Sequence, residues 1–279
     1  MKLLFIKWNV NPELFRIGEF PLRYYSLMFV IAFFLGYLLM KRMYLKEGLE
    51  VRKLDSLVIY LVLGTLIGAR LGHVFFYEFG YYMHHPLEII FPFRISNKTF
   101  EWTGYQGLAS HGGAIGVLLA ILLYCKKYKQ EFLKIVDKVV IVVALAGFFI
   151  RMGNLFNSEI IGKPTDLPWA FIFERVDLIP RHPSQVYEGL AYLIIFVILW
   201  YLYQHRGVQL KKGFLFGLFL VLVFSARFLI EFTKENQESF ENSLLINMGQ
   251  ILSIPFIGIG VYFISRKTRD QKKEAIINK

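Results

Sequence analysis

Long apolar stretches alternate with short polar connections along almost the whole chain. A helix needs about 20 mostly apolar residues to cross the roughly 30 Å hydrocarbon core of a bilayer. Seven stretches approach or reach this length, and most are apolar on all sides, as expected for lipid-embedded helices. They lie at about 22–40, 54–79, 107–125, 135–150, 184–203, 213–233 and 245–265. The pattern therefore predicts an all-α, polytopic membrane protein with about seven transmembrane helices.

The positive charges in the connections predict the orientation of these helices. Cytoplasmic connections of membrane proteins carry an excess of Lys and Arg. One set of connections holds 18 of these residues and the opposite set holds 9. The richer set comprises 41–53, 126–134, 204–212 and the tail at 266–279. We therefore expect an outside N-terminus, a cytoplasmic C-terminus and two long outer loops, at about 80–106 and 152–183, in a single membrane domain that covers 1–279.

Composition agrees with a membrane protein and excludes several other classes. Hydrophobic residues make up 56% of the 279 residues and charged residues only 19%, below the roughly 25% of soluble domains. Cys125 is the single cysteine, which excludes an internal disulfide framework. The net charge of +11 falls in the predicted cytoplasmic segments, where topology and anionic lipid explain it. We therefore expect the bilayer, and no nucleic acid, as a partner.

Ionisable residues within these stretches gather in the predicted outer halves. Because a charge inside a bilayer is costly, each of them suggests a functional site. Arg70 lies about 14 Å from the outer end of its helix at 1.5 Å per residue, too deep for a side chain that only reaches the interface. Arg227 and Glu231, one turn apart, could also form a purely structural ion pair. A shared cavity open toward the outer leaflet explains the whole set better.

The predicted cavity is rich in arginine. Its charged residues are Arg70, Arg151 and Arg227 with Glu159, Glu188 and Glu231. The planar fork of an arginine matches a phosphate group through two parallel hydrogen bonds. Since a phosphate-bearing ligand that enters from the outer leaflet is a phospholipid, the pattern predicts a site for a phospholipid head group.

Three motifs lie in this polar layer, and the first is Ser110-His111-Gly112-Gly113. Glycines on a membrane helix permit the close approach of another helix or a ligand. His111 could be a hydrogen-bonded core residue, or a base that takes a proton near neutral pH.

The second motif runs from Arg151 through Asn154, Asn157 and Glu159 to Gly162. One arginine, two amides and a carboxylate at the end of a helix can together hold a phosphate and a hydroxylated head group. The alternative is an ordinary helix end, at which Asn and Gly are common.

The third motif is Arg181-His-Pro-Ser-Gln185-Val-Tyr187-Glu188, at the entry into the fifth stretch. Ser184 could cap this helix, with Tyr187 and Glu188 in the first turn. Neither the metal-binding spacings of His and Cys nor a phosphate-binding glycine loop occur in the sequence. We therefore expect no metal and no cofactor.

These motifs resemble those of the bacterial prolipoprotein diacylglyceryl transferases. The family signature reads Gly-Arg-x-Gly-Asn-Phe-x-Asn-x-Glu-x-x-Gly, and the segment that ends at Gly162 departs from it at Ile150 and Leu155. The His-Gly-Gly motif, the third motif, Tyr-Tyr-Ser-Leu-Met at 24–28 and Arg-Phe-x-x-Glu around Arg227 also look like family blocks, in the family's order.

The resemblance implies a multi-pass enzyme of the bacterial inner (cytoplasmic) membrane, with its active site toward the outer leaflet. Its expected substrates are phosphatidylglycerol and prolipoprotein signal peptides that bear a lipobox cysteine. The diacylglyceryl group would move to the cysteine thiol, forming a thioether and releasing glycerol-1-phosphate, as the first step of lipoprotein maturation. The resemblance leaves the oligomeric state open.

With this activity in view, we expect Arg151 and Asn154 to bind the phosphate, Arg227 to polarise the ester or favour the thiolate, and His111 to be the base. Tyr25 would position the head group. Further expected phospholipid-binding residues are Asn157, Glu159, Gly162 and Arg70. Expected supporting residues are Gly112, Gly113, Gln185, Tyr187, Glu188 and Glu231.

Two other classes of protein would also place arginines in a membrane cavity. One is a transporter or flippase for an anionic lipid, and the other is a non-catalytic phospholipid-binding scaffold. A transporter fits poorly because the polar residues stop halfway across the bilayer and no repeated halves are visible. A scaffold leaves His111 in the same layer without a purpose.

Overall fold

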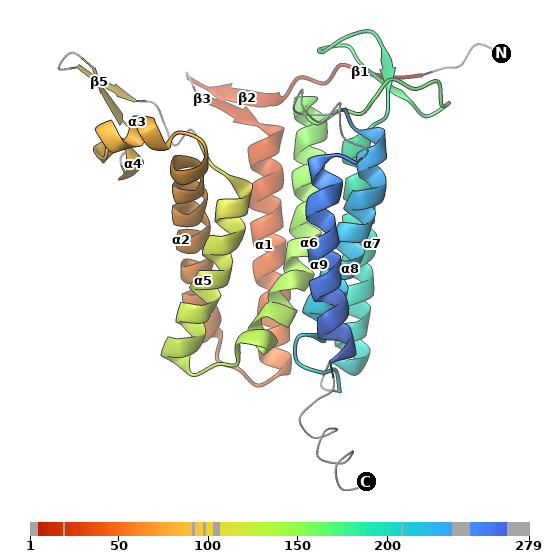
Figure 1. Ribbon diagram of the computed structural model, residues 1–279. Helices are drawn as coiled ribbons and strands as arrows, with labels where there is room; N and C mark the ends of the chain where they lie inside the picture. The colour runs from red at the N-terminus through yellow and green to blue at the C-terminus, as the bar shows by residue number, and fades with distance from the viewer. Residues whose placement is uncertain are drawn as a thin grey trace, which may run out of the picture. The chain divides into compact units, whose positions relative to one another are not determined.

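The computed structural model describes residues 5–18, 20–90, 93–96, 99–102, 107–207, 209–235 and 246–266. Each of the seven predicted stretches contains a long helix (Figure 1). These helices are α1 (Tyr24–Lys46), α2 (Val51–Phe76), α5 (Ser110–Tyr128), α6 (Phe132–Asn157), α7 (Ser184–Arg206), α8 (Phe214–Ile230) and α9 (Met248–Ser265). Among the described residues, five helices are long and apolar enough to cross a membrane, namely α1, α2, α7, α8 with its extension to Thr233, and α9. The crossing by α5 and α6, and with it the number seven, stays a prediction.

The prediction of an all-α chain was wrong for the segments before and between the long helices. A three-stranded sheet has the order β1 (Ile6–Trp8), β6 (Phe171–Phe173) and β7 (Pro180–Arg181), with β1 parallel to β6. Two antiparallel hairpins join β2 (Glu13–Ile17) to β3 (Phe20–Arg23), and β4 (Phe93–Ser96) to β5 (Thr99–Trp102). Three short helical segments complete the described chain: α3 (Phe79–His84), α4 (Leu87–Ile90) and the 3-10 helix η1 (Glu231–Thr233). Strands this short give no hydrophobic period to detect.

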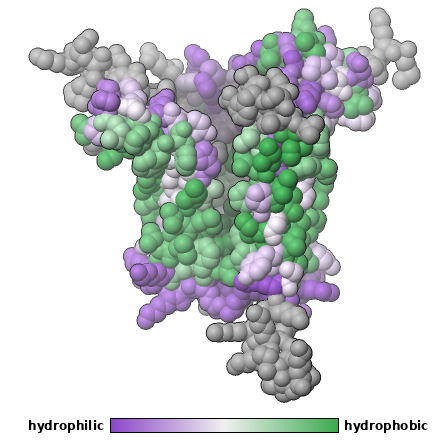
Figure 2. Space-filling view, in the orientation of Figure 1, coloured by the Kyte–Doolittle hydropathy of each residue, from purple (hydrophilic) through white to green (hydrophobic). Residues whose placement is uncertain are grey.

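The chain divides into two compact units, and each is described by itself. Unit 1 combines 1–40 with 136–279, and unit 2 is 41–135. In both units, hydrophobic side chains cover the middle of the helices and hydrophilic ones gather at the helix ends (Figure 2). This is the surface expected of helices embedded in lipid. The single membrane domain expected from the sequence stays a prediction.

In unit 2, α2 and α5 approach each other closely along a row of glycines. Gly64, Gly68 and Gly72 on α2 meet Gly112 and Gly116 on α5, and a methyl group on Gly116 would overlap the carbonyl oxygen of Gly64. Small residues spaced by four allow membrane helices to pack backbone against backbone. Gly112 therefore serves helix packing, one of the two roles that the sequence left open.

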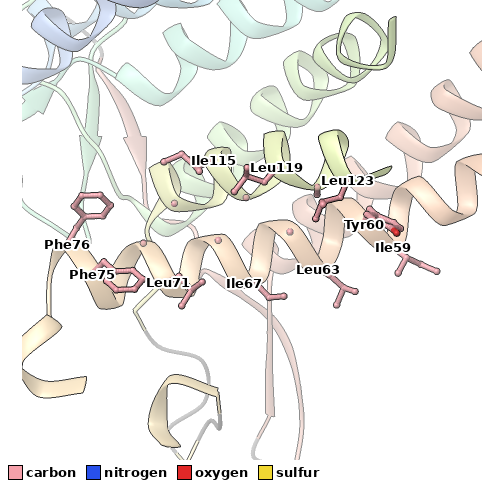
Figure 3. A pocket seen from close by; sticks show the side chains of 16 residues that line it. Ile59, Tyr60, Leu63, Ile67, Leu71, Phe75, Phe76, Ile115, Leu119 and Leu123 are labelled. Atoms are coloured by element: carbon pink, nitrogen blue, oxygen red, sulfur yellow. The ribbon is translucent and has the colours of Figure 1, made fainter. Parts of the chain in front are cut away.

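Because glycine has no side chain, this contact leaves an apolar groove along the two helices (Figure 3). The groove has a volume of about 630 Å³. Larger apolar side chains of both helices line it, including Ile67, Leu71 and Phe75 of α2 and Ile115 and Leu119 of α5. The groove lacks charged residues among its lining and has the chemical character of a lipid-facing surface.

In unit 1, polar side chains fix the ends of the helices. Asp137 of α6 accepts hydrogen bonds from the backbone N–H groups of Gly213 and Phe216, at 2.6 and 2.8 Å, and so caps the start of α8. Asn247 and Gln250 form a reciprocal capping box at the start of α9, with two bonds of 3.0 Å. Such caps satisfy N–H groups that no helical carbonyl can reach.

Gly116→Ala tests the close packing in unit 2. The added methyl group would collide with the backbone of α2, so we expect a loss of about 1–3 kcal/mol in the free energy of unfolding. Gly258→Ala on α9 is the matched control, because nothing lies within 4 Å of a Cβ there. Thermal unfolding in detergent measures both variants. A Gly116→Ala protein as stable as the control would contradict the packing.

Candidate active site

Most of the predicted site residues lie at one end of unit 1. At this end α1, α7 and α9 begin and α6 and α8 finish (Figure 1). The residues placed there are Tyr25, Arg151, Asn154, Asn157, Glu159, Gly162, Gln185, Tyr187, Glu188, Arg227 and Glu231. Arg70, His111, Gly112 and Gly113 belong to unit 2.

Five charged residues of unit 1 form a continuous chain of ion pairs, which we call the ion network. The Nε atom of Arg151 lies 2.5 Å from Oε2 of Glu188, whose Oε1 accepts a 2.7 Å hydrogen bond from Nζ of Lys234. The same ammonium group donates to Oε2 of Glu231 at 3.2 Å, and Nε of Arg227 lies 4.0 Å from that oxygen. The network therefore joins α6, α7, α8 and the segment after η1.

The middle of the ion network is buried and its two arginine ends are more accessible. The side chains of Glu188 and Lys234 are 2% and 5% exposed, whereas those of Arg151 and Arg227 are 16% and 40% exposed. A buried charge needs a countercharge, and the contact between Arg151 Nε and Glu188 Oε2 supplies one as an ion pair without hydrogen-bond geometry. The two guanidinium groups therefore lie at the accessible ends of the network, next to the buried carboxylates of Glu188 and Glu231.

Lys234 is a site residue that the sequence analysis missed. In the sequence it is one of the nine Lys and Arg residues in the connections that are poor in positive charge. The available signal was its position three residues after Glu231, because i,i+3 neighbours can pair on a helix. Its contact with Glu188 on α7 could not be inferred from spacing.

The second motif is held together by amide groups. Nη1 of Arg151 donates to Oδ1 of Asn154 at 3.0 Å, since the two residues are one turn apart on α6. The Nδ2 atoms of Asn154 and Asn157 then donate to the two carboxylate oxygens of Glu159, at 3.1 and 3.0 Å. Four of the side chains predicted to bind phospholipid therefore form one connected group.

The backbone just beyond α6 is strained. Ser158 and Ile160 have φ angles of 57° and 56°, and a β-branched residue rarely adopts this left-handed conformation. Such a conformation costs about 1–3 kcal/mol per residue and persists only where neighbours enforce it. The carbonyl of Glu159 between them accepts a hydrogen bond from the amide of Gln185, which is fully buried.

Gly162 lies where no side chain fits. A Cβ atom there would come within 2.6 Å of both His182 Cβ and the carbonyl oxygen of Thr233. The backbone of Gly162 forms an antiparallel bridge with Lys234. This glycine therefore fixes the position of Lys234, and its predicted contact with phospholipid stays a prediction.

The third motif divides between two tasks. Glu188 belongs to the ion network, and Gln185 donates to the carbonyl oxygen of Glu159 just beyond α6. The hydroxyl of Tyr187 instead accepts a 2.9 Å hydrogen bond from Nε1 of Trp169 in the long loop. The prediction that Ser184 caps α7 was wrong. It is the first residue of the helix, and its hydroxyl lies 3.2 Å from that of Thr233.

Arg181 and His182 also stabilise the long loop. Arg181 donates to both carboxylate oxygens of Asp177 and lies 2.5 Å from Oε1 of Glu235. Its guanidinium holds the pKa of the Asp177 carboxyl below its usual range. Burial lowers the pKa of His182, because an apolar environment disfavours the charged imidazolium.

Tyr25 lies beside the second motif. The ring of Tyr25 packs on Gly153, where a Cβ atom would lie 2.7 Å from its Cδ2. The expected role of Tyr25 in positioning the head group stays a prediction.

In unit 2, His111 and Arg70 differ sharply. His111 is exposed at the start of α5, with its ring 5.1 Å from that of Phe76, and it makes no hydrogen bond within the described part of the chain. Arg70 donates to the carbonyl oxygens of Glu88, Ile89 and Gly107. Arg70 thus ties the segment after α2 in place, and its phospholipid role stays a prediction.

Comparison with known proteins identifies the family. The family model for prolipoprotein diacylglyceryl transferase matches residues 12–266. A relative from Bacteroides fragilis is 48% identical over 263 residues, covering 94% of this chain and 95% of the relative. A relative from Tolumonas auensis is 45% identical over 267 residues (95% and 99%), and one from Chloroherpeton thalassium is 42% identical over 271 residues (97% of each).

All three relatives are named phosphatidylglycerol–prolipoprotein diacylglyceryl transferase. The similarity extends over nearly the full length of both proteins in each pair, so it includes all the motifs that suggested the resemblance. The chain belongs to the prolipoprotein diacylglyceryl transferase family and is a transferase.

Proposed function

We propose that the chain transfers the diacylglyceryl group of phosphatidylglycerol to the lipobox cysteine of a prolipoprotein. The names of the relatives support this activity over a flippase or a scaffold. The structural observation that carries it is the ion network, in which Arg151 and Arg227 lie at the accessible ends of a buried set of countercharges. Such preorganised cations stabilise a phosphate on which negative charge develops.

The reaction replaces a carbon–oxygen bond of the diacylglyceryl group with a carbon–sulfur bond. The sulfur of the cysteine thiolate attacks the diacylglyceryl carbon that carries the phosphate, and the carbon–oxygen bond to phosphate breaks with its electron pair on oxygen. The products are the thioether and glycerol-1-phosphate. The thiol, whose pKa is near 8.5, must lose its proton to a base before or during the attack.

Arg151 and Asn154 bind the phosphate in this proposal. The Arg151 guanidinium offers a planar fork to two phosphate oxygens. Its contacts with Glu188 and Asn154 fix the orientation of that fork before the lipid arrives. Asn157 and Glu159 complete the polar surface for the glycerol hydroxyls, beside Tyr25.

We assign the activation of the thiol to Arg227 and His111. Arg227 polarises the ester or favours the thiolate, because its guanidinium is the more exposed end of the ion network. His111 takes the proton, since arginine does not deprotonate at working pH. Its exposed ring at the start of α5 is accessible to a substrate.

We place this site at the outer leaflet of the bacterial cytoplasmic membrane. The end of unit 1 that carries the ion network is also the end joined to connections poor in Lys and Arg. Such connections are those exported from the cytoplasm.

A synthetic lipobox peptide tests the activity. Purified protein in phosphatidylglycerol micelles should add one diacylglyceryl mass to the peptide cysteine, with stoichiometric release of glycerol phosphate. Protein that is folded and binds the lipid but leaves the peptide unchanged would instead indicate a scaffold or a flippase.

Arg151→Lys tests the bidentate contact. A lysine keeps the charge but not the fork, so we expect peptide modification to fall by about 100-fold, as for loss of a key donor to a developing oxyanion. Arg175→Lys, on the exposed part of the long loop, is the control and should retain full activity. Full activity in the Arg151→Lys variant would refute the assignment.

His111→Gln tests the base. If His111 removes the thiol proton, the loss of rate should shrink as the pH rises from 7 toward about 9, because the peptide thiol then ionises by itself. His84→Gln, at an exposed position of α3, provides the control and should retain full activity at each pH. A deficit that stays constant over this range would show that His111 acts in another way.

A further inference from the structure

The ion network contains more positive than negative charge. Its cations are Arg151, Arg227 and Lys234, and its carboxylates are Glu188 and Glu231, so the formal charge is +1. Without Lys234 each arginine would face one carboxylate and the sum would be zero. The lysine pairs with both carboxylates, so it is the cation in excess of the two arginine–carboxylate pairs, although it is the most buried of the three cations.

We infer that Lys234 supplies the surplus positive charge with which the ion network selects an anionic lipid head group. Lys234 is a positioning residue, since its buried ammonium group acts through Glu188 and Glu231 without reaching the lipid. By occupying Oε1 of Glu188, it prevents this carboxylate from neutralising Arg151 fully. The charge of Arg151 remains available to a phosphate.

The backbone supports this role. Lys234 directly follows η1, its N–H donates to the carbonyl oxygen of Glu231, and its backbone bridges to Gly162. Two neighbouring carboxylates lie outside the network. Glu159 is exposed and accepts the amides of Asn154 and Asn157, and Glu235, which follows Lys234, is half-exposed and paired with Arg181. Water screens an exposed charge far more than a buried one, so the surplus of the network persists beside them.

Lipid binding tests the inference directly. We would measure the affinity of the full chain for phosphatidylglycerol and for zwitterionic phosphatidylcholine in neutral detergent micelles, without peptide. Lys234→Met should weaken phosphatidylglycerol binding by about tenfold or more, the effect of one poorly screened charge, and leave phosphatidylcholine binding unchanged. Lys234→Arg should bind like the unmodified protein. The control is Lys163→Met, which removes an exposed lysine of the nearby loop.

A double variant separates charge from mere support of the fold. Lys234→Met combined with Glu231→Gln restores the formal charge of +1, so phosphatidylglycerol affinity should recover. A double variant that binds as weakly as Lys234→Met, or a Lys234→Met protein with unchanged affinity, would overturn the inference. If Lys234→Met alone does not fold, the double variant should still bind phosphatidylglycerol more weakly than Glu231→Gln, and equal affinities would overturn it.

The inference rests on the proposed function only for the identity of the lipid. Because binding is measured without peptide, its outcome is independent of turnover. An unmodified protein that selects phosphatidylglycerol but never modifies a peptide would contradict the transferase activity alone. Normal transfer with no charge dependence of binding would contradict the inference alone.

Discussion

The end of unit 1 that carries the ion network depends on the shared carboxylate of Glu188. This group is almost completely buried and is held by Arg151 from α6 and Lys234 from beyond α8. Removing one partner of a buried ion pair commonly costs about 3–5 kcal/mol, because the remaining charge is left in a medium that solvates it poorly. A single side chain of α7 therefore holds together three segments that lie far apart in the sequence.

The same constraint links stability to chemistry. The contacts that compensate the buried carboxylates also fix the direction of the Arg151 guanidinium. The strained turn at Ser158 and Ile160 carries Glu159 into contact with both asparagines. The polar groups are thus oriented before a substrate binds, which is the condition under which electrostatic stabilisation of a transition state is largest.

The association of the helices with one another depends on a different interaction. Lipid tails are as apolar as the side chains, so hydrophobic burial does little to bring membrane helices together. In unit 2, α2 and α5 are instead held together by close backbone packing, as at Gly68 and Gly112. The His-Gly-Gly motif therefore combines an exposed histidine with a glycine used for packing.

Much of the fold could be predicted because hydrophobic length reports directly on membrane helices. All seven stretches contain helices, and the run from Arg151 to Gly162 does gather its polar groups at one helix end. The strands were missed because β1 acquires its partner only from β6, far along the chain. Lys234 was missed for the same reason, since its burial depends on Glu188 and on the bridge to Gly162.

The side to which a residue points was also hard to predict. Tyr187 and Glu188 are adjacent in sequence, but the tyrosine contacts Trp169 in the loop and the glutamate contacts the buried cations. On a helix, neighbouring residues point about 100° apart, and spacing alone does not say which direction leads to the site. Contacts between distant segments decide it.

A structure of the protein with phosphatidylglycerol bound, in the absence of peptide, is the most direct measurement. We expect the lipid phosphate within hydrogen-bonding distance of the Arg151 guanidinium, with Lys234 still between Glu188 and Glu231. A phosphate bound away from both Arg151 and Arg227, with the ion network unchanged, would contradict the assignment of this network as the head-group site.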